Sequence, residues 1–238
     1  MGSVFGKIDV AEQAAYKTIK TFANFEIRLY AESVAVETPC GTSLSSPEHN
    51  IAFRRLAAYI GVIGTPQNTK NSENAPEQIA MTAPVLTSTP AKNNSEQIAM
   101  TAPVLTSAPS RNNSEQIAMT APVLTSKSDK QMMSFILPSK YTIDNAPLPL
   151  DPEVTLRRIP ERYCAVVRFS GICYDETAKQ KAAFVLNELK NNSIEPTSET
   201  KERLESGEQY WELARYNPPW AIPFLRTNDV MIPVEYEL

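Results

Sequence analysis

Histidine and cysteine are scarce in this sequence, with one histidine and three cysteines among 238 residues. The single His49 gives a Ser-His-Asp triad or a zinc hydrolase little to build on. Cys40, Cys164 and Cys173 are odd in number and show no CxxC spacing, so we interpret them as buried free thiols in a reducing compartment. A zinc site or a cysteine nucleophile is the alternative interpretation.

Long apolar runs and an excess of basic charge are also absent. The longest apolar run, LAAYIGVIG, is far too short to cross a bilayer, and the start MGSVFGKIDV lacks the apolar core of a signal peptide. The net charge is −4, whereas a nucleic-acid binder normally presents a basic face. We therefore expect a cytoplasmic protein with no membrane span and no nucleic-acid partner.

Two segments show the spacing of amphipathic helices. In SPEHNIAFRRLAAYIG, Ser46 suits the N-cap, Pro47 suits the first helical position and Gly61 suits the end. In DETAKQKAAFVLNELKNN, Asp175 opens a second helix. Short segments rich in β-branched and aromatic residues predict strands at 16–22, 25–31, 33–38, 132–138, 154–160, 163–171, 210–217 and 229–237. Strands grouped around two helices predict an α+β fold with a curved sheet or barrel.

One phrase, EQIAMTAPVLTS, occurs three times with a period of 19, as the positions Met81, Met100 and Met119 show. Such a period is close to that of the shortest solenoid repeats, so stacking of the copies is one interpretation. The other, which we favour, is that the first copy supplies a strand at 79–86. The remaining copies then form a duplicated excursion at about 87–130 within a single domain, 1–238. Unpaired apolar copies expose strand edges, so pairing of two molecules into a homodimer is a predicted consequence.

Five phrases in order, FEIRLY, FRRLAAYIGVIG, IAMTAPV, FILPSKY and ARYNPPW…FLRTNDVMIPVE, resemble the SOUL haem-binding protein family, in particular its plant-type cytosolic members. The resemblance runs from about Phe5 to Glu235. It implies a distorted β-barrel of about eight to nine strands in two pseudo-symmetric halves, with two flanking α-helices. It also implies binding of haem or another tetrapyrrole, without an established enzymatic activity.

Family precedent places the haem against the first helix, where the matching positions here include Asn50, Phe53 and Ala57. The family's basic residues are not reproduced one for one, so Arg54 is our candidate partner for the propionates. The alternative is that Phe53 and Ala57 pack on the sheet while Arg54 is solvated. Leu29 stands where some members carry an axial histidine.

Three further residues and the lone histidine complete the predicted site. Tyr216 and Trp220 flank two prolines in RYNPPW, where they either stack on a planar ligand or form a lid. Arg226 lies in the next polar turn and is a candidate to meet a carboxylate. His49 is the one histidine available as an iron ligand, although a solvated role is the alternative.

We therefore predict a carrier or buffer of a small-molecule tetrapyrrole, held by apolar contacts and propionate pairing without an axial histidine of the family type. The alternatives are an enzyme acting on a bulky hydrophobic ligand in the same groove, and an interaction protein that uses the expanded repeat loop. No catalytic constellation stands out in the sequence, so we expect a binding protein rather than an enzyme.

Overall fold

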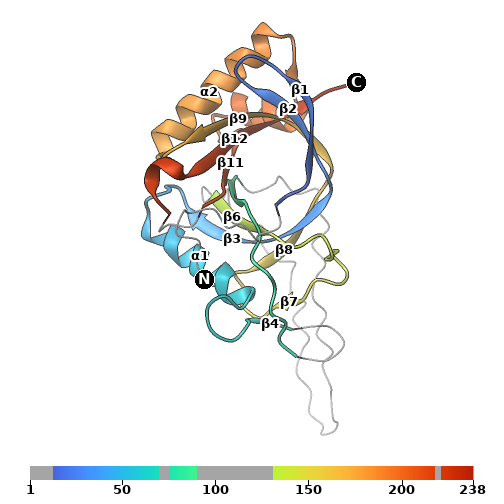
Figure 1. Ribbon diagram of the computed structural model, residues 1–238, viewed down its shortest axis with the longest axis vertical. Coiled ribbons are helices and arrows are strands. Elements are labelled where there is room, and N and C mark those ends of the chain that lie inside the picture. Colours follow the sequence, from blue (N-terminus) through green and yellow to red (C-terminus); the bar gives the residue numbers. More distant parts are fainter. Residues whose placement is uncertain (1–12, 70–74, 90–130, 218–220, 238) are drawn as a thin grey trace, which may run out of the picture.

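The computed structural model describes residues 13–69, 75–89, 131–217 and 221–237. Its main element is a strongly curled antiparallel sheet of ten strands (Figure 1). Nine strands follow one another across the sheet in the order β1 (Tyr16–Thr21), β2 (Glu26–Tyr30), β9 (Arg162–Ser170), β12 (Thr227–Glu235), β11 (Glu212–Arg215), β5 (Val85–Ser88), β6 (Gln131–Ile136), β3 (Ser33–Gly41) and β8 (Thr155–Ile159). The tenth strand, β10 (Glu195–Pro196), pairs with β12, and β4 (Asn68–Thr69) pairs with β7 (Leu148–Pro149) in a separate small sheet.

The sheet is open, which corrects the expected barrel. Its edge strands are β1 and β8, and no pairing joins them among the described residues. Both edges carry basic side chains, Lys17 and Lys20 on β1 and Arg157 and Arg158 on β8. Charged side chains on an edge strand discourage pairing with a further strand.

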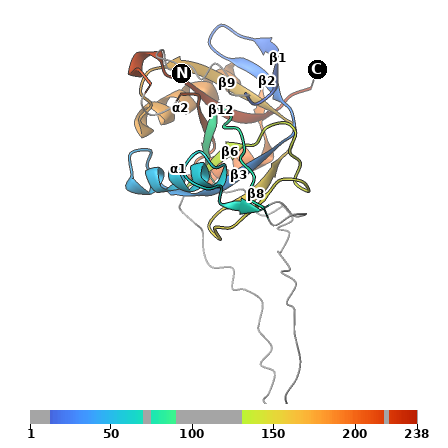
Figure 2. The same ribbon diagram turned by 60° about the horizontal axis from the view of Figure 1, so that its bottom comes forward.

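Two helices cover the outer face of the sheet, one on each half. The helix α1 (Pro47–Tyr59) packs on β3 and β6, and α2 (Asp175–Asn191) packs on β9 and β12 (Figure 1, Figure 2). Both match the predicted helices. The Ser46 side chain caps α1 by accepting a hydrogen bond from the His49 backbone N–H at 3.3 Å, and Gly61 ends the helical segment with a φ of +80°.

A third helix, α3 (Ser198–Glu205), corrects the prediction of two. Its sequence SETKERLE has no apolar stripe, because the residues it buries are the polar Thr200 and Arg203. Thr197 caps it by accepting a hydrogen bond from the Thr200 backbone N–H at 3.3 Å. A short 3-10 turn, η1 (Pro223–Leu225), precedes β12.

Alternation along the strands sorts the core into three apolar clusters. One lies between α1 and the sheet and includes Leu56 and Phe135, and another lies under α2 and includes Val185 and Ile232. The third lies on the inner face of the curled sheet and includes Tyr30, Leu86, Ile136, Cys164, Val166 and Met231. Because successive strand residues face opposite sides, the same strands serve both the outer and the inner clusters.

The first repeat copy supplies β5, as expected, although the strand runs from Val85 to Ser88 rather than over 79–86. Pro84 lacks a backbone N–H and cannot donate to a strand ladder, so pairing begins after it. The strand pairs with β6 on one side and β11 on the other. The second and third copies lie in the connection between β5 and β6, outside the described residues, as do the predicted solenoid stacking and dimer pairing.

Removing residues 95–113, one 19-residue unit, should raise the free energy of unfolding by less than about 1 kcal/mol, because the entropic cost of closing a loop falls only with the logarithm of its length. Urea unfolding followed by circular dichroism measures the change. A loss of several kcal/mol would show that the second copy packs against the fold and would contradict its assignment to a connecting loop.

Candidate functional site

A buried ion pair connects β2 and β12 on the inner face of the sheet. The Arg28 Nη1 donates to Asp229 Oδ2 at 2.7 Å, and both side chains are almost fully buried, at 1% and 0% exposure. Arg28 also pairs with Glu26 and donates to the Tyr30 hydroxyl at 3.1 Å. These three β2 residues alternate along the strand, so all of them face inward.

Asp229 is the acceptor at the centre of this network. The Nε and Nη2 of Arg168 both donate to its carboxylate at 2.8 Å, and the Tyr216 hydroxyl donates at 2.8 Å. Burial acts to raise the pKa of Asp229, but the hydrogen bonds from Arg168 and the charge of Arg28 more than offset it and hold the pKa below its usual value. The aspartate therefore stays ionised and holds Arg28 in place.

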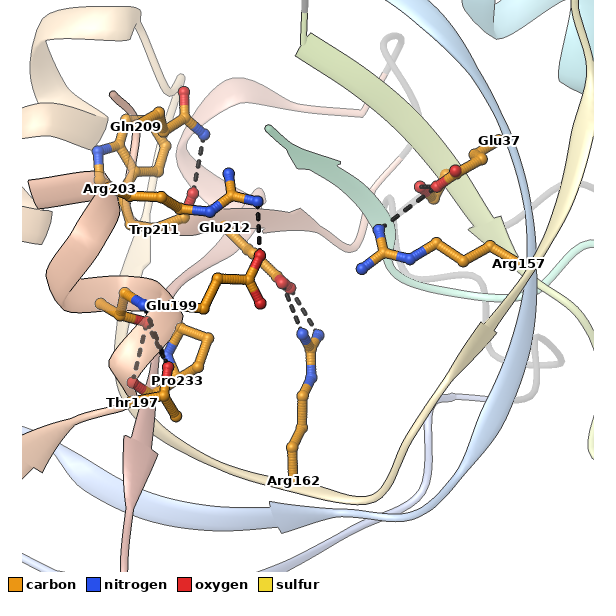
Figure 3. Close-up of polar contacts among 12 residues, drawn as sticks. Glu37, Arg157, Arg162, Thr197, Glu199, Arg203, Gln209, Trp211, Glu212 and Pro233 are labelled. Atoms are coloured by element: carbon orange, nitrogen blue, oxygen red, sulfur yellow. Dashed lines mark hydrogen bonds and ion pairs between the residues drawn. The ribbon is translucent and has the colours of Figure 1, made fainter. Parts of the chain in front are cut away.

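Two further ion pairs line the same interior (Figure 3). Arg162 donates two hydrogen bonds to Glu212, both at 2.6 Å, and Arg157 lies 3.5 Å from Glu37. Burial acts to raise the pKa of Glu212, but the Arg162 charge and hydrogen bonds bring it below normal. Burial raises the pKa of Glu37, and its longer contact with Arg157 offsets only part of this effect. The interior charges are thus largely paired with one another.

The space left inside the curled sheet is small. A cavity of about 110 Å³ lies between the inner cluster and the segments before β1 and after β6, lined by Tyr30, Leu86, Ile136, Ile159, Arg162 and Met231 among others. Pockets for drug-sized ligands typically measure about 300–1,000 Å³. The cavity as it stands therefore does not enclose a large planar molecule.

An apolar surface lies outside the sheet, at the ends of β9 and β11. It consists of five exposed side chains from residues 171–174 and η1 and is here called the apolar rim: Ile172, Tyr174, Ile222, Phe224 and Leu225. Two hydrogen bonds hold these segments together, from Gly171 N to Arg226 O and from the Asn228 side chain to Gly171 O, both at 3.0 Å. Phe224 is 72% exposed, and because contiguous exposed apolar patches mark binding surfaces, these residues are candidates for one.

His49 connects α1 to the strand that leads to this rim. Its Nε2 contacts the Nη2 of Arg215 at the end of β11. An arginine side chain only donates hydrogen bonds, so Nε2 is the acceptor and the neutral ring carries its proton on Nδ1. Burial lowers the pKa of His49 to about 4, assisted by the Arg215 charge and opposed by Asp175. The first turn of α1 is therefore fixed beside the segment that follows β11.

The predicted site residues are spread over several parts of the structure. Asn50 and Arg54 are exposed on α1, and Arg54 has no ion-pair partner within the described part of the chain. Phe53 and Ala57 belong to the apolar cluster under the same helix, where Phe53 packs edge-on against Phe135. Their packing agrees with the alternative interpretation of these two residues.

The other predicted residues lie apart from this helix face. Leu29 is half-buried on the outer side of β2, and His49 is buried rather than solvated, at 5% exposure. Tyr216 faces inward to Asp229, and Arg226 follows η1 with its Nε donating to Ala221 O at 3.1 Å. Trp220 lies outside the described residues. The ligand roles of all these residues stay predictions.

The sequence interpretation missed the charged interior. Its members come from β2, β3, β8, β9, β11 and β12, and pairing across the sheet brings them together: Glu26, Arg28, Glu37, Arg157, Arg162, Arg168, Glu212 and Asp229. A signal was present in FEIRLY, where Glu26, Arg28 and Tyr30 alternate with apolar residues. That pattern also fits a strand with a solvated face, so it did not reveal burial.

The described residues contain neither a metal-ligand cluster nor a helix suited to span a membrane. No cluster of three or more His, Cys, Asp and Glu side chains in this part of the chain has the arrangement of a metal site. Among the same residues, no helix is both long and apolar enough to cross a membrane.

The geometry defines an α+β protein with a filled, charged sheet interior and an apolar rim on its surface. The family model described as SOUL heme-binding protein matches residues 11–94 and 109–233, which is most of the chain. This chain belongs to the SOUL heme-binding protein family.

Solved structures match this chain at low sequence identity. A hydrolase from Listeria innocua is 11% identical with a TM-score of 0.49, and the match covers 91% of this chain and 94% of that one. The EcmrR C-terminal domain is 10% identical with a TM-score of 0.44, covering 93% of this chain and 99% of that one. Among curated proteins, no sequence matches this chain.

Replacing Asp229 with Asn should lower the free energy of unfolding by about 3 kcal/mol, because it leaves Arg28 as a buried charge without its main partner. Urea denaturation at pH 7 measures the loss. The control is Glu32→Gln, which breaks an exposed pair with Arg158 at 2.6 Å and should leave the midpoint unchanged. Equal effects of the two substitutions would refute the central role of the buried pair.

The low pKa of His49 predicts a stability loss in mild acid. The folded pKa of about 4 lies below the ordinary 6.5, so the stabilisation is fully present above pH 6.5 and is lost as the pH falls toward 4. The wild type should lose about 3 kcal/mol more than His49→Gln over this range. Unfolding at several pH values measures the difference. An NMR titration of the single imidazole with a midpoint near 6.5 would contradict it.

Proposed function

We propose that this protein binds haem or another tetrapyrrole and acts as a carrier or buffer for it. Membership of the SOUL heme-binding protein family carries the proposal. The free thiols Cys40, Cys164 and Cys173 support a reducing, cytoplasmic setting for such a role. The assignment to plant-type members of the family is part of the same proposal.

The proposed binding surface runs from α1 to the apolar rim. Ile51 is 54% exposed on the first turns of α1, three residues before the unpaired Arg54. The contact between His49 and Arg215 keeps this end of α1 beside the segment leading to η1. In this arrangement the apolar porphyrin ring contacts Ile51 and Phe224, and one of its charged propionates pairs with Arg54.

The size of the cavity supports binding on this surface rather than inside the sheet. An internal site would require the inner cluster and its paired charges to separate, because only about 110 Å³ is open there. Breaking buried ion pairs costs several kcal/mol. A surface site avoids this cost but buries less of the ligand, so we expect modest affinity.

The candidate residues fit the porphyrin ring and its propionates better than they fit the iron. Leu29 has no ligating atom, and His49 Nε2 is occupied by Arg215. When bound, haem supplies an iron centre, and ligation of that iron by His49 would require the contact with Arg215 to break. We therefore propose that the ring and the propionates supply most of the affinity.

A titration with haemin and with metal-free protoporphyrin tests the proposal. We expect saturable 1:1 binding of both, within about tenfold in Kd, followed by the Soret band and by tryptophan quenching. Phe224→Ser and Arg54→Ala should each weaken binding by roughly tenfold. The matched controls Leu150→Ser and Arg158→Ala alter exposed residues elsewhere and should leave Kd unchanged.

Two results would overturn parts of this proposal. The absence of saturable binding of either ligand would refute the carrier function. Haemin binding more than a hundredfold tighter than protoporphyrin, with a Soret spectrum that changes in His49→Gln, would instead show ligation of the iron by His49.

A further inference from the structure

The first repeat copy is held in the sheet along its whole length. Residues 77–88 comprise β5, which lies between β11 and β6, and the irregular segment that precedes β5. We call the place that these residues fill the β5 slot. At one end, Asn68 exchanges hydrogen bonds of 2.8 Å with the backbone of Glu77, and Tyr141 donates to its carboxylate at 2.8 Å. At the other end, Val85–Ser88 pairs with both neighbouring strands.

The side chains between these ends are buried. Ile79 is 1% exposed in the cluster under α1, and Leu86 is 5% exposed in the inner cluster. The Thr82 hydroxyl donates to Ile136 O, and Ala83 O accepts from Ala14 N at 3.1 Å. Every contact that the segment makes in the slot therefore comes from the twelve letters EQIAMTAPVLTS.

The same twelve letters stand at 96–107 and at 115–126 without one difference. Each side chain that fills the slot thus has two equivalents, and Ile79, for example, corresponds to Ile98 and Ile117. The interior of the slot cannot distinguish one copy from another, because it meets identical side chains in identical order.

The flanking residues distinguish the copies only weakly. Thr89 follows the first copy and donates to Gln209 O at 3.0 Å, whereas Ala108 and Lys127 follow the others. Loss of that hydrogen bond changes an equilibrium by roughly two- to tenfold. Placing the second or third copy in the slot lengthens the connection after β4 and shortens the one before β6. These opposed changes in closure entropy alter the equilibrium constant between two copies by a factor of about two to three.

We propose that the β5 slot is a docking site for any of the three copies, and that the second and third copies exchange with the first within one molecule. The hydrogen bond of Thr89 and the difference in loop closure together favour the first copy over the others by about one order of magnitude at most in the occupancy of the slot. The exchange leaves the sheet unchanged and moves the inserted chain from one side of the strand to the other. A destabilising substitution in one copy is therefore compensated when another copy occupies the slot.

Ile79→Asp tests this exchange in two backgrounds. In a chain lacking residues 90–127 only the first copy remains, and a buried aspartate there should raise the unfolding equilibrium constant by at least about a thousandfold. In the full chain another copy takes the slot, so the rise should be roughly tenfold. Ile98→Asp should have no effect, and the triple change at Ile79, Ile98 and Ile117 should unfold the full chain. Equal losses from Ile79→Asp in the two backgrounds would overturn the proposal.

Disulfide trapping identifies the occupant directly. Ser88 lies opposite Met132 in the register between β5 and β6, and Ser107 and Ser126 are its equivalents. With Met132→Cys, we expect Ser107→Cys and Ser126→Cys to form intramolecular disulfides in the folded protein, as Ser88→Cys does. The controls Thr106→Cys and Thr125→Cys face the opposite side of the strand and should not. Crosslinking of Ser88→Cys alone, or only products of twice the mass, would overturn exchange within one molecule.

Discussion

The ion pair between Arg28 and Asp229 is the constraint on which the rest of the sheet depends. It connects strands far apart in the sequence, and almost no water reaches either side chain. A buried arginine is tolerated only when its charge is paired and its hydrogen bonds are made. Tyr30 accepts a further hydrogen bond from Arg28, while Arg168 and Tyr216 donate to Asp229, so the network joins β2, β9 and β12 with the residue that follows β11.

This polar centre also bears on the proposed ligand site. A sheet interior filled with paired charges leaves little room and penalises separation of the strands. Exposed apolar side chains remain outside the sheet, Ile51 on α1 and the five residues of the apolar rim, and His49 on α1 contacts Arg215 at the end of β11.

The fold tolerates the repeated segments because of where they are inserted. The first copy enters the sheet, and the chain leaves and returns through the connection between two neighbouring antiparallel strands. Lengthening such a connection costs little, because closure entropy grows only with the logarithm of its length. Duplication of a strand at this point therefore adds copies of the strand without disturbing its pairing.

Local patterns in the sequence determined the elements: Ser46 and Gly61 bounded α1, the spacing of Ala182, Val185 and Leu189 gave α2, and β-branched runs gave the long strands. The sequence did not predict the polar helix α3, because this helix is held by tertiary contacts of Thr200 and Arg203 rather than by a stripe of apolar residues. The family also followed from sequence phrases. Only the tertiary structure decided that the sheet stays open, that Arg28 faces Asp229 and that His49 is buried. These outcomes depend on contacts between residues distant in the chain, which no local pattern records.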